Sequence, residues 1–164
     1  MEEETETNRA WLLDFGGGVQ AACGHHEMWQ VLISPTLFEV PCTTFYCDNV
    51  LIFQDDILPV LDVISLFEQK VIQTSSQIVG IAIYQQNPSA PIHYAGLRLA
   101  NMPLSVYVSD EQMCDLPADQ PFQEPLAISC FSYENKEIPI IDFAYLFSEE
   151  FNLLRQSQHV DVFN

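Results

Sequence analysis

Five residues in the first third of the chain have side chains that bind metals or carry thiol chemistry: Cys23, His25, His26, Cys42 and Cys47. Thiolates and imidazoles are the usual ligands of zinc in proteins. The run from Cys23 to His26 supplies both types, and Cys42-x4-Cys47 supplies a second thiol pair. Neither pair has the spacing of a zinc finger or a zinc ribbon. We therefore keep a thiol- or metal-binding protein as an alternative, while buried thiols and exposed histidines are the ordinary expectation.

Other combinations of reactive residues also fall short of catalysis. The glycines at 16–18 precede neither a clear helix nor the Lys and Ser/Thr of a phosphate loop, so they predict a hairpin turn. A turn and a helix N-cap explain the carboxylates of Asp55, Asp56 and Asp62. His93 and His159 are isolated, and no triad assembles around them. The pattern disfavours an enzyme.

The charge of the chain limits its partners. Only five Lys and Arg residues stand against 23 Asp and Glu residues, which gives a formal net charge of −18. Phosphate backbones and anionic lipid surfaces repel such a protein, so nucleic acid and membrane are poor partners. The acidic N-terminus has no apolar core, and no apolar run approaches the length of a membrane span. We expect a cytoplasmic protein without a disulfide scaffold, because five cysteines form an odd set.

A repeat in the sequence predicts the secondary structure around Asp55, Asp56 and Asp62. The stretch Ile57 to Phe67 returns 80 residues later as Glu137 to Phe147, with Pro, Asp, Leu and Phe in the same places. In each copy an apolar run is followed by a polar turn and a second strand. The second strand ends at an Asp, which is Asp62 in the first copy and Asp142 in the second. Such a pattern predicts a β-hairpin followed by a short helix that the Asp caps.

The remaining segments indicate an all-β chain. Strands are predicted on both sides of the glycine turn and over 78–84, 93–99 and 104–108, with turn signals between them. Residues 109–125 are acidic and rich in proline, which predicts an irregular exposed loop. Residues 143–154 have the apolar spacing of an amphipathic helix. Many short strands and little helix favour a sandwich or small barrels.

We divide the chain accordingly. Residues 1–8 are expected to be an acidic disordered tail, 9–156 a single domain and 157–164 a second tail. The repeat units occupy about 45–69 and 126–150. The polar connection at 73–77 is the best candidate boundary between the two halves of the domain.

Four segments together resemble the CheW-like chemotaxis adaptors. The run from Val50 to Asp62 resembles the family's G-V-I-N-L-R-G-x-I-L-P-V-I-D-L segment, and Tyr94 to Leu99 its V-G-L-L-V-D strand. The run from Tyr133 to Phe143 resembles its final strand, G-x-I-x-L-L-D-L. Trp11 to Phe15 resembles the opening Y-L-V-F strand, so the match spreads over nearly the whole chain.

This resemblance implies a fold and a role. It implies two intertwined five-stranded SH3-like β-barrels that share a core, with short helices and a C-terminal helix. It also implies a non-enzymatic scaffold, without a cofactor, in a two-component signalling system. Its expected partners are a chemoreceptor cytoplasmic tip and the regulatory domain of a histidine kinase. Edge strands and an apolar groove between barrels are suitable docking surfaces for such partners.

The departures from the family pattern indicate where partner choice is set. Gln54 replaces the family's Arg and Asp55 its Gly, which removes or inverts a charge-assisted contact. A divergent member that serves type IV pili or surface motility is one interpretation. The expected contact residues are Val50, Leu51, Phe53, Gln54 and Asp55. The alternative within this fold is a degenerate scaffold whose acidity directs it to another protein with a basic surface.

Overall fold

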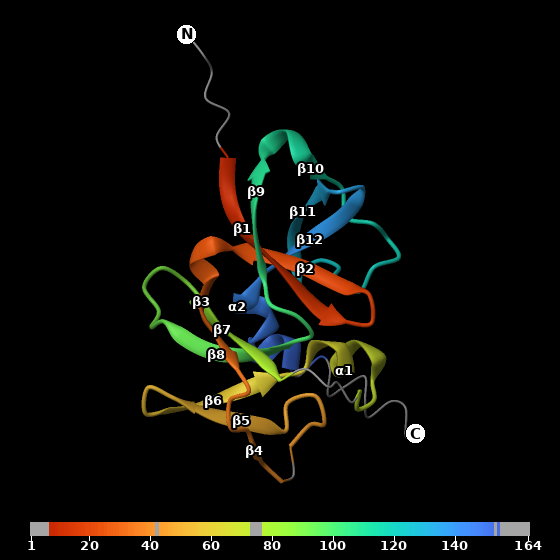
Figure 1. The fold of residues 1–164 in the computed structure, drawn as a ribbon. Coiled ribbons are helices and arrows are strands. Elements are labelled where there is room, and N and C mark those ends of the chain that lie inside the picture. The colour runs from red at the N-terminus through yellow and green to blue at the C-terminus, as the bar shows by residue number, and fades with distance from the viewer. Residues whose placement is uncertain (1–6, 42, 73–76, 153, 155–164) are drawn as a thin grey trace.

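The computed structural model describes residues 7–41, 43–72, 77–152 and 154, and they form two curled sheets, one in the upper and one in the lower half of Figure 1. One sheet, here called the terminal barrel, has the strand order β10-β11-β12-β2-β1-β9. Its strands are β1 (Thr7–Gly16), β2 (Val19–Gly24), β9 (Leu104–Ser109), β10 (Met113–Cys114), β11 (Ala127–Tyr133) and β12 (Lys136–Ile141).

The other sheet, here called the central barrel, has the order β3-β7-β8-β6-β5-β4. Its strands are β3 (Met28–Ile33), β4 (Phe38–Glu39), β5 (Asn49–Phe53), β6 (Asp56–Leu61), β7 (Ile78–Tyr84) and β8 (His93–Leu99). Each sheet thus has five longer strands and one strand of two residues. The prediction of an all-β fold with two five-stranded barrels is confirmed.

The chain passes between the barrels at places other than the predicted boundary. Residues 73–76 lie outside the described residues, but β6 before them and β7 after them belong to the same sheet. The chain instead crosses from β2 through the short 3-10 helix η1 (His25–Glu27) into β3, and again from β8 into β9. The boundary predicted at 73–77 is therefore wrong, because a polar linker here joins two strands of one barrel.

The repeat forms the predicted hairpin and capped helix in both barrels. In the central barrel β5 and β6 lead into α1 (Val63–Glu68), and in the terminal barrel β11 and β12 lead into α2 (Phe143–Leu146). The carboxylates of Asp62 and Asp142 accept hydrogen bonds from the N–H groups of Ser65 and Tyr145, each at 3.3 Å. An aspartate that follows a strand can satisfy the free N–H groups of a first helical turn. The predicted caps are confirmed.

A large apolar core joins the two barrels, and α2 lies where they meet (Figure 1). It takes Phe15 and Ala21 from the terminal barrel, Leu97 from the central barrel, and side chains from both short helices. Two smaller cores fill the barrels separately, around Phe131 in the terminal barrel and around Leu51 in the central one. The two barrels thus pack on each other through a shared apolar core.

The acidic segment 109–125 is only partly the exposed loop that we expected. It contains the 3-10 helix η2 (Asp110–Gln112) and the strand β10. Its Phe122 is fully buried in the shared core, where its ring centroid lies 5.9 Å from that of Phe15 and 4.9 Å from that of Phe67. One aromatic side chain provides enough apolar area to anchor a loop whose neighbours are polar.

The predicted helix over 143–154 is interrupted. Residues 149–152 are helical again after a break at Phe147 and Ser148. The hydroxyl of Ser148 donates to the carbonyl of Tyr145 at 2.6 Å and accepts from the N–H of Phe151 at 3.1 Å. One serine thus ends one helical turn and starts the next, which apolar periodicity does not reveal.

At the ends of the chain, β1 begins at Thr7, two residues before the predicted start of the domain. The predicted tails at 1–6 and 157–164 lie outside the described residues. Within the part of the chain that the structure describes, no helix has both the length and the apolar character needed to cross a membrane.

Candidate partner-binding site

The hairpin of β5 and β6, here called the first hairpin, turns at Gln54 and Asp55. Both residues have positive φ, 50° and 68°, and Phe53 pairs with Asp56 across the turn. Two central residues in the left-handed region define a tight turn that matches the twist of the flanking strands. Both side chains are exposed at the tip of the hairpin. The turn that departs from the family pattern is therefore accessible to a partner.

The five predicted contact residues lie on different sides of this hairpin. Leu51 is 1% exposed and belongs to the core of the central barrel. Phe53 is half-buried on the same side, with its ring centroid 6.5 Å from that of Tyr94. Val50 is half-buried on the opposite side of the strand, and Gln54 and Asp55 lie at the tip. Val50, Gln54 and Asp55 can meet a partner directly, while Leu51 holds the strand from inside.

Sequence reasoning missed the most exposed apolar residues of the hairpin. Ile52 is 62% and Ile57 71% exposed, and they are partners across β5 and β6. Cross-strand partners and residues two apart share one face of a sheet. By the strand pairing, three more apolar residues lie on the same side as Ile52 and Ile57. We call this outward apolar surface the hairpin face, and it consists of Phe38, Val50, Ile52, Ile57 and Pro59. Alternation along β5 puts Leu51 and Ile52 on opposite sides of the strand, but it does not show which side faces the core.

The hairpin of β11 and β12, here called the second hairpin, has the same backbone turn but a different outward surface. Its turn residues Glu134 and Asn135 have φ of 48° and 64°. The pair that corresponds to Ile52 and Ile57 is Ser132 and Glu137. Pro139 is buried, whereas the corresponding Pro59 is exposed. Of these two hairpins, only the first has the exposed isoleucine pair.

A groove between the central barrel and the segment that begins at the end of α2 continues from the hairpin face. It has a volume of about 560 Å³ and includes Pro59 in its wall. Other parts of the wall come from β6, β7, the end of α2 and the segment after it, and include Leu61, Tyr84, Leu146, Phe147 and Phe151. Burial in this wall raises the pKa of Tyr84 above its ordinary value, so the phenol stays neutral. None of the described wall residues belongs to a strand of the terminal barrel, so this groove differs from the one that we expected between the two barrels.

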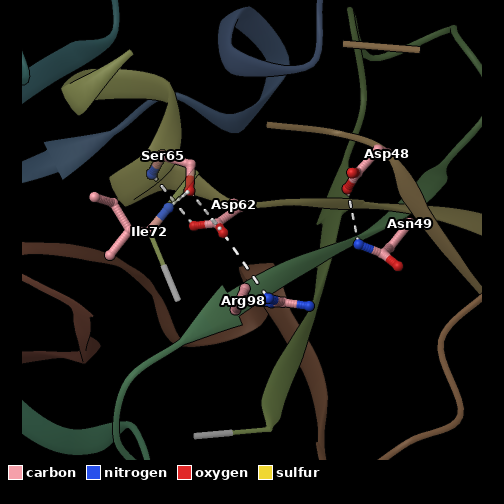
Figure 2. A network of polar contacts seen from close by, with 6 residues as sticks. All are labelled: Asp48, Asn49, Asp62, Ser65, Ile72 and Arg98. Carbon is pink, nitrogen blue, oxygen red and sulfur yellow. Dashed lines mark hydrogen bonds and ion pairs between the residues drawn. The ribbon is translucent and has the colours of Figure 1, made fainter. Parts of the chain in front are cut away.

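A polar network secures the corner where β6 meets α1 (Figure 2). The hydroxyl of Ser65 donates to Asp62 at 2.9 Å and accepts from the N–H of Ile72 at 3.1 Å. The guanidinium of Arg98, on β8, lies 3.9 Å from the same carboxylate. The side chains of Arg98 and Asp62 are 25% and 15% exposed, so solvent screens the pair only in part. The network fixes the base of the hairpin beside a hollow of about 300 Å³.

The corresponding corner of the terminal barrel has the opposite charge environment. Val60 pairs with Gly96 in the central barrel, and its counterpart Ile140 pairs with Ala22 in the terminal barrel. Arg98 lies two residues after Gly96, and Gly24 lies two residues after Ala22, so Gly24 occupies the place of Arg98. The N–H of Gly24 donates to the carboxylate of Glu27 at 2.8 Å. Burial, and to a smaller extent the Asp142 charge, raise the pKa of Glu27, while the Gly24 bond opposes them. Asp62 thus faces a cation and Asp142 a second carboxylate.

The thiol and imidazole residues do not assemble into the metal site that we considered. Cys23 is buried in the shared core, where burial and the Glu27 charge raise the pKa of its thiol. His25 stacks on Trp11 with a centroid distance of 5.3 Å, and His26 is exposed. Cys47 lines the groove, and Cys42 lies outside the described residues. Among the residues that are described, no three of His, Cys, Asp or Glu are arranged to hold a metal ion.

Comparison with known proteins supports the fold. No family model matches the sequence, and no curated protein matches it either. Among solved structures, the chain is similar to the crystal structure of the scaffolding protein TtCheW from Thermoanaerobacter tengcongensis, with a TM-score of 0.71 and 14% identity. The match covers 89% of this chain and 96% of that chain. The two curled sheets are therefore SH3-like subdomains, and the chain has the CheW-like fold.

Proposed function

We propose that this protein is a non-enzymatic adaptor that couples a chemoreceptor cytoplasmic tip to the regulatory domain of a histidine kinase. The likeness of its fold to a scaffolding protein over nearly the whole chain supports this role. The observation that carries the proposal is the hairpin face, because a pair of exposed isoleucines on a rigid hairpin is a surface that a partner covers.

The shape of this surface suits a helical partner. The hairpin face ends in the groove beside the central barrel, and an amphipathic helix can lay its apolar side along both. The strand β4 lies at the edge of the central sheet beside β5, so a second SH3-like domain can add a strand there. One barrel thus offers two separate modes of docking, as an adaptor with two partners requires.

The test uses the full chain and two baits from the same genome. One bait is the helical hairpin of a chemoreceptor tip, and the other is the regulatory domain of a chemotaxis-like histidine kinase. We expect binding to both in a titration followed by calorimetry. A helical hairpin of equal length with its residue order scrambled is the control. Binding to neither bait would falsify the proposal.

The turn residues refine the proposal to a pathway. Gln54 and Asp55 stand at the exposed tip where the family resemblance places Arg and Gly. A changed tip fits a receptor other than the flagellar ones, and we propose a system that controls type IV pili or surface motility in the cytoplasm. Deletion of the gene should then reduce surface motility and leave swimming unchanged. Loss of swimming alone would contradict this refinement.

A scaffold for a different, basic partner is the second candidate. Asp55 and Asp56 are exposed beside the hairpin face, and the chain as a whole has a formal net charge of −18. Such charges accelerate association with a basic surface, and salt screens them. If binding to an identified partner weakens steeply with salt, the basic-partner scaffold is favoured. If it changes little, docking on the apolar hairpin face is favoured.

A further inference from the structure

Two cysteines face each other across the edge of the terminal barrel. Cys114 on β10 and Cys130 on β11 are register partners in antiparallel strands. The thiol of Cys114 donates to the sulfur of Cys130, with the two sulfurs 3.1 Å apart. Side chains of such partners leave the sheet on the same side, and their backbone separation lies within the range that a disulfide spans.

The two thiols differ in access. Cys130 is fully buried, whereas Cys114 is partly exposed. Cys114 also lines an open hollow of about 550 Å³ between β10 and the segment that leads to β11. A small reagent in solvent therefore reaches the sulfur of Cys114 before that of Cys130, and the Cys130 sulfur is close enough to react with the modified Cys114. This arrangement distinguishes an attacking thiol from a resolving one.

The protonation of the inner thiol agrees with this division. Burial raises the pKa of Cys130 to about 12, and the charges of Glu137 and Asp115 act in the same direction. Cys130 is therefore a neutral thiol at ordinary pH and a poor first nucleophile, because the thiolate is the reactive form.

We propose that Cys114 and Cys130 form a reversible cross-strand disulfide in response to hydrogen peroxide. The Cys114 thiolate attacks one peroxide oxygen, the O–O bond breaks, and hydroxide leaves, so Cys114 becomes a sulfenic acid. Cys130 then attacks the Cys114 sulfur and loses its proton to the departing hydroxide, which leaves as water. Two thiols and one peroxide thus give one disulfide and two waters.

The surroundings select the class of oxidant. The hollow beside Cys114 is lined by Asp115 and Glu124, and the protein carries a large excess of negative charge. Oxidised glutathione is anionic and is repelled from such a site, whereas hydrogen peroxide is small and neutral. We therefore expect peroxide to react faster than oxidised glutathione at equal concentration.

The disulfide would fasten a specific part of the fold. It closes a loop that contains Phe122, the side chain that anchors the segment after β10 in the shared core. A crosslink across a loop of this length restricts the unfolded chain and stabilises the folded one. The corresponding pair in the central barrel is Phe38 and Val50, which have no thiols. Of these two corresponding positions, only the one in the terminal barrel can therefore form a disulfide.

The experiment treats the reduced full-length protein with hydrogen peroxide, blocks the remaining thiols, and maps the peptides by mass spectrometry without reduction. We expect a Cys114–Cys130 peptide pair that is two hydrogen atoms lighter than the separate thiols and that dithiothreitol reverses. The unfolding temperature should rise by several degrees on oxidation. In Cys130→Ser, dimedone should trap a sulfenic acid at Cys114.

Cys47→Ser is the matched control, because Cys47 is also half-buried, and this variant should form the disulfide as the unaltered protein does. The measurement on the unaltered protein does not depend on whether a variant folds. Linkage of Cys114 to another cysteine, oxidation of Cys114 without Cys130, or no reaction at Cys114 would each overturn the proposal.

Discussion

The two hairpins of this protein have the same backbone and different surroundings. Each has a two-residue turn with positive φ, a proline four residues after the turn in its second strand, and a capping aspartate. The first presents Ile52 and Ile57 outward and faces Arg98 at its base, whereas the second presents Ser132 and Glu137 and faces Glu27. The shared residues build the fold, and the residues that differ give the first hairpin an exposed apolar surface.

The largest expected effect comes from giving the first hairpin the outward pair of the second. The double variant Ile52→Ser/Ile57→Glu should lose at least about 2 kcal/mol of binding free energy to a receptor tip or kinase domain. Its stability should change by less than about 1 kcal/mol, because both side chains are mostly exposed. Calorimetric titration and urea unfolding measure the two quantities.

The reciprocal variant Ser132→Ile/Glu137→Ile is the control for this exchange. It should bind as the unaltered protein does, since the first hairpin is intact. If the exchange at Ile52 and Ile57 left the affinity for both baits unchanged, the hairpin face would not be the docking surface.

The next effect compares the two caps. Asp62→Ala should lower the free energy of unfolding by about 2 kcal/mol, because it removes the bonds to Ser65 and the partner of Arg98. Asp142→Ala should lower it by about 1 kcal/mol or less, since its loss also relieves the repulsion with Glu27. Urea unfolding of both variants checks the difference.

Asparagine at the same positions separates the cap from the charge, because its side-chain oxygen also caps a helix. Asp62→Asn should still destabilise the protein, and Asp142→Asn should leave it unchanged or stabilise it. Equal losses for the two asparagine variants would contradict the opposite charge environments of the two corners.

A smaller effect concerns Glu27 and pH. Its pKa is raised in the folded protein, so the folded state favours the protonated form, and the charged form destabilises the fold at neutral pH. Glu27→Gln keeps an acceptor for Gly24 and should raise the free energy of unfolding by about 0.5 kcal/mol at neutral pH, since solvent screens this partly exposed group.

As the pH falls through the raised pKa of Glu27 towards its ordinary value, the unaltered protein takes up the proton. The advantage of Glu27→Gln should therefore disappear over that window, and unfolding curves at several pH values measure it. A gain that persists in acid would point to packing rather than charge.

The smallest effect compares the turns. Asp55 and Asn135 both have positive φ, where glycine is unstrained and asparagine is better tolerated than aspartate. Asp55→Gly should stabilise the protein by about 0.5 kcal/mol, and Asn135→Gly by less. Thermal unfolding distinguishes them, and a larger gain at Asn135 would contradict this ranking.

Local signals in the sequence predicted much of the fold. The spacing of proline and aspartate predicted both hairpins and both caps, because the turn and the N-cap depend on neighbouring residues only. The buried strand at 78–84 followed from its β-branched run. These elements are the ones whose chemistry is complete within a few residues.

The misses depend on distant partners. The burial of Phe122 requires Phe15 and Phe67, which lie far away in the sequence. The exposure of Ile52 depends on which side of β5 faces the core, and alternation alone does not fix that side. The charge at the base of each hairpin comes from Arg98 and Glu27, which lie outside the repeat. The location of the partner site at the β5–β6 hairpin therefore stays a prediction, and the structure adds the outward residues Ile52 and Ile57 to it.

The order of strands along the chain has a consequence for biosynthesis. All strands of the central barrel lie between Met28 and Leu99, so this barrel is complete once that stretch has left the ribosome. In the terminal barrel, β1 waits for β9 and β2 waits for β12, although both are made first. Their apolar side chains therefore remain open to chaperones and to other nascent chains until nearly the last strand is translated.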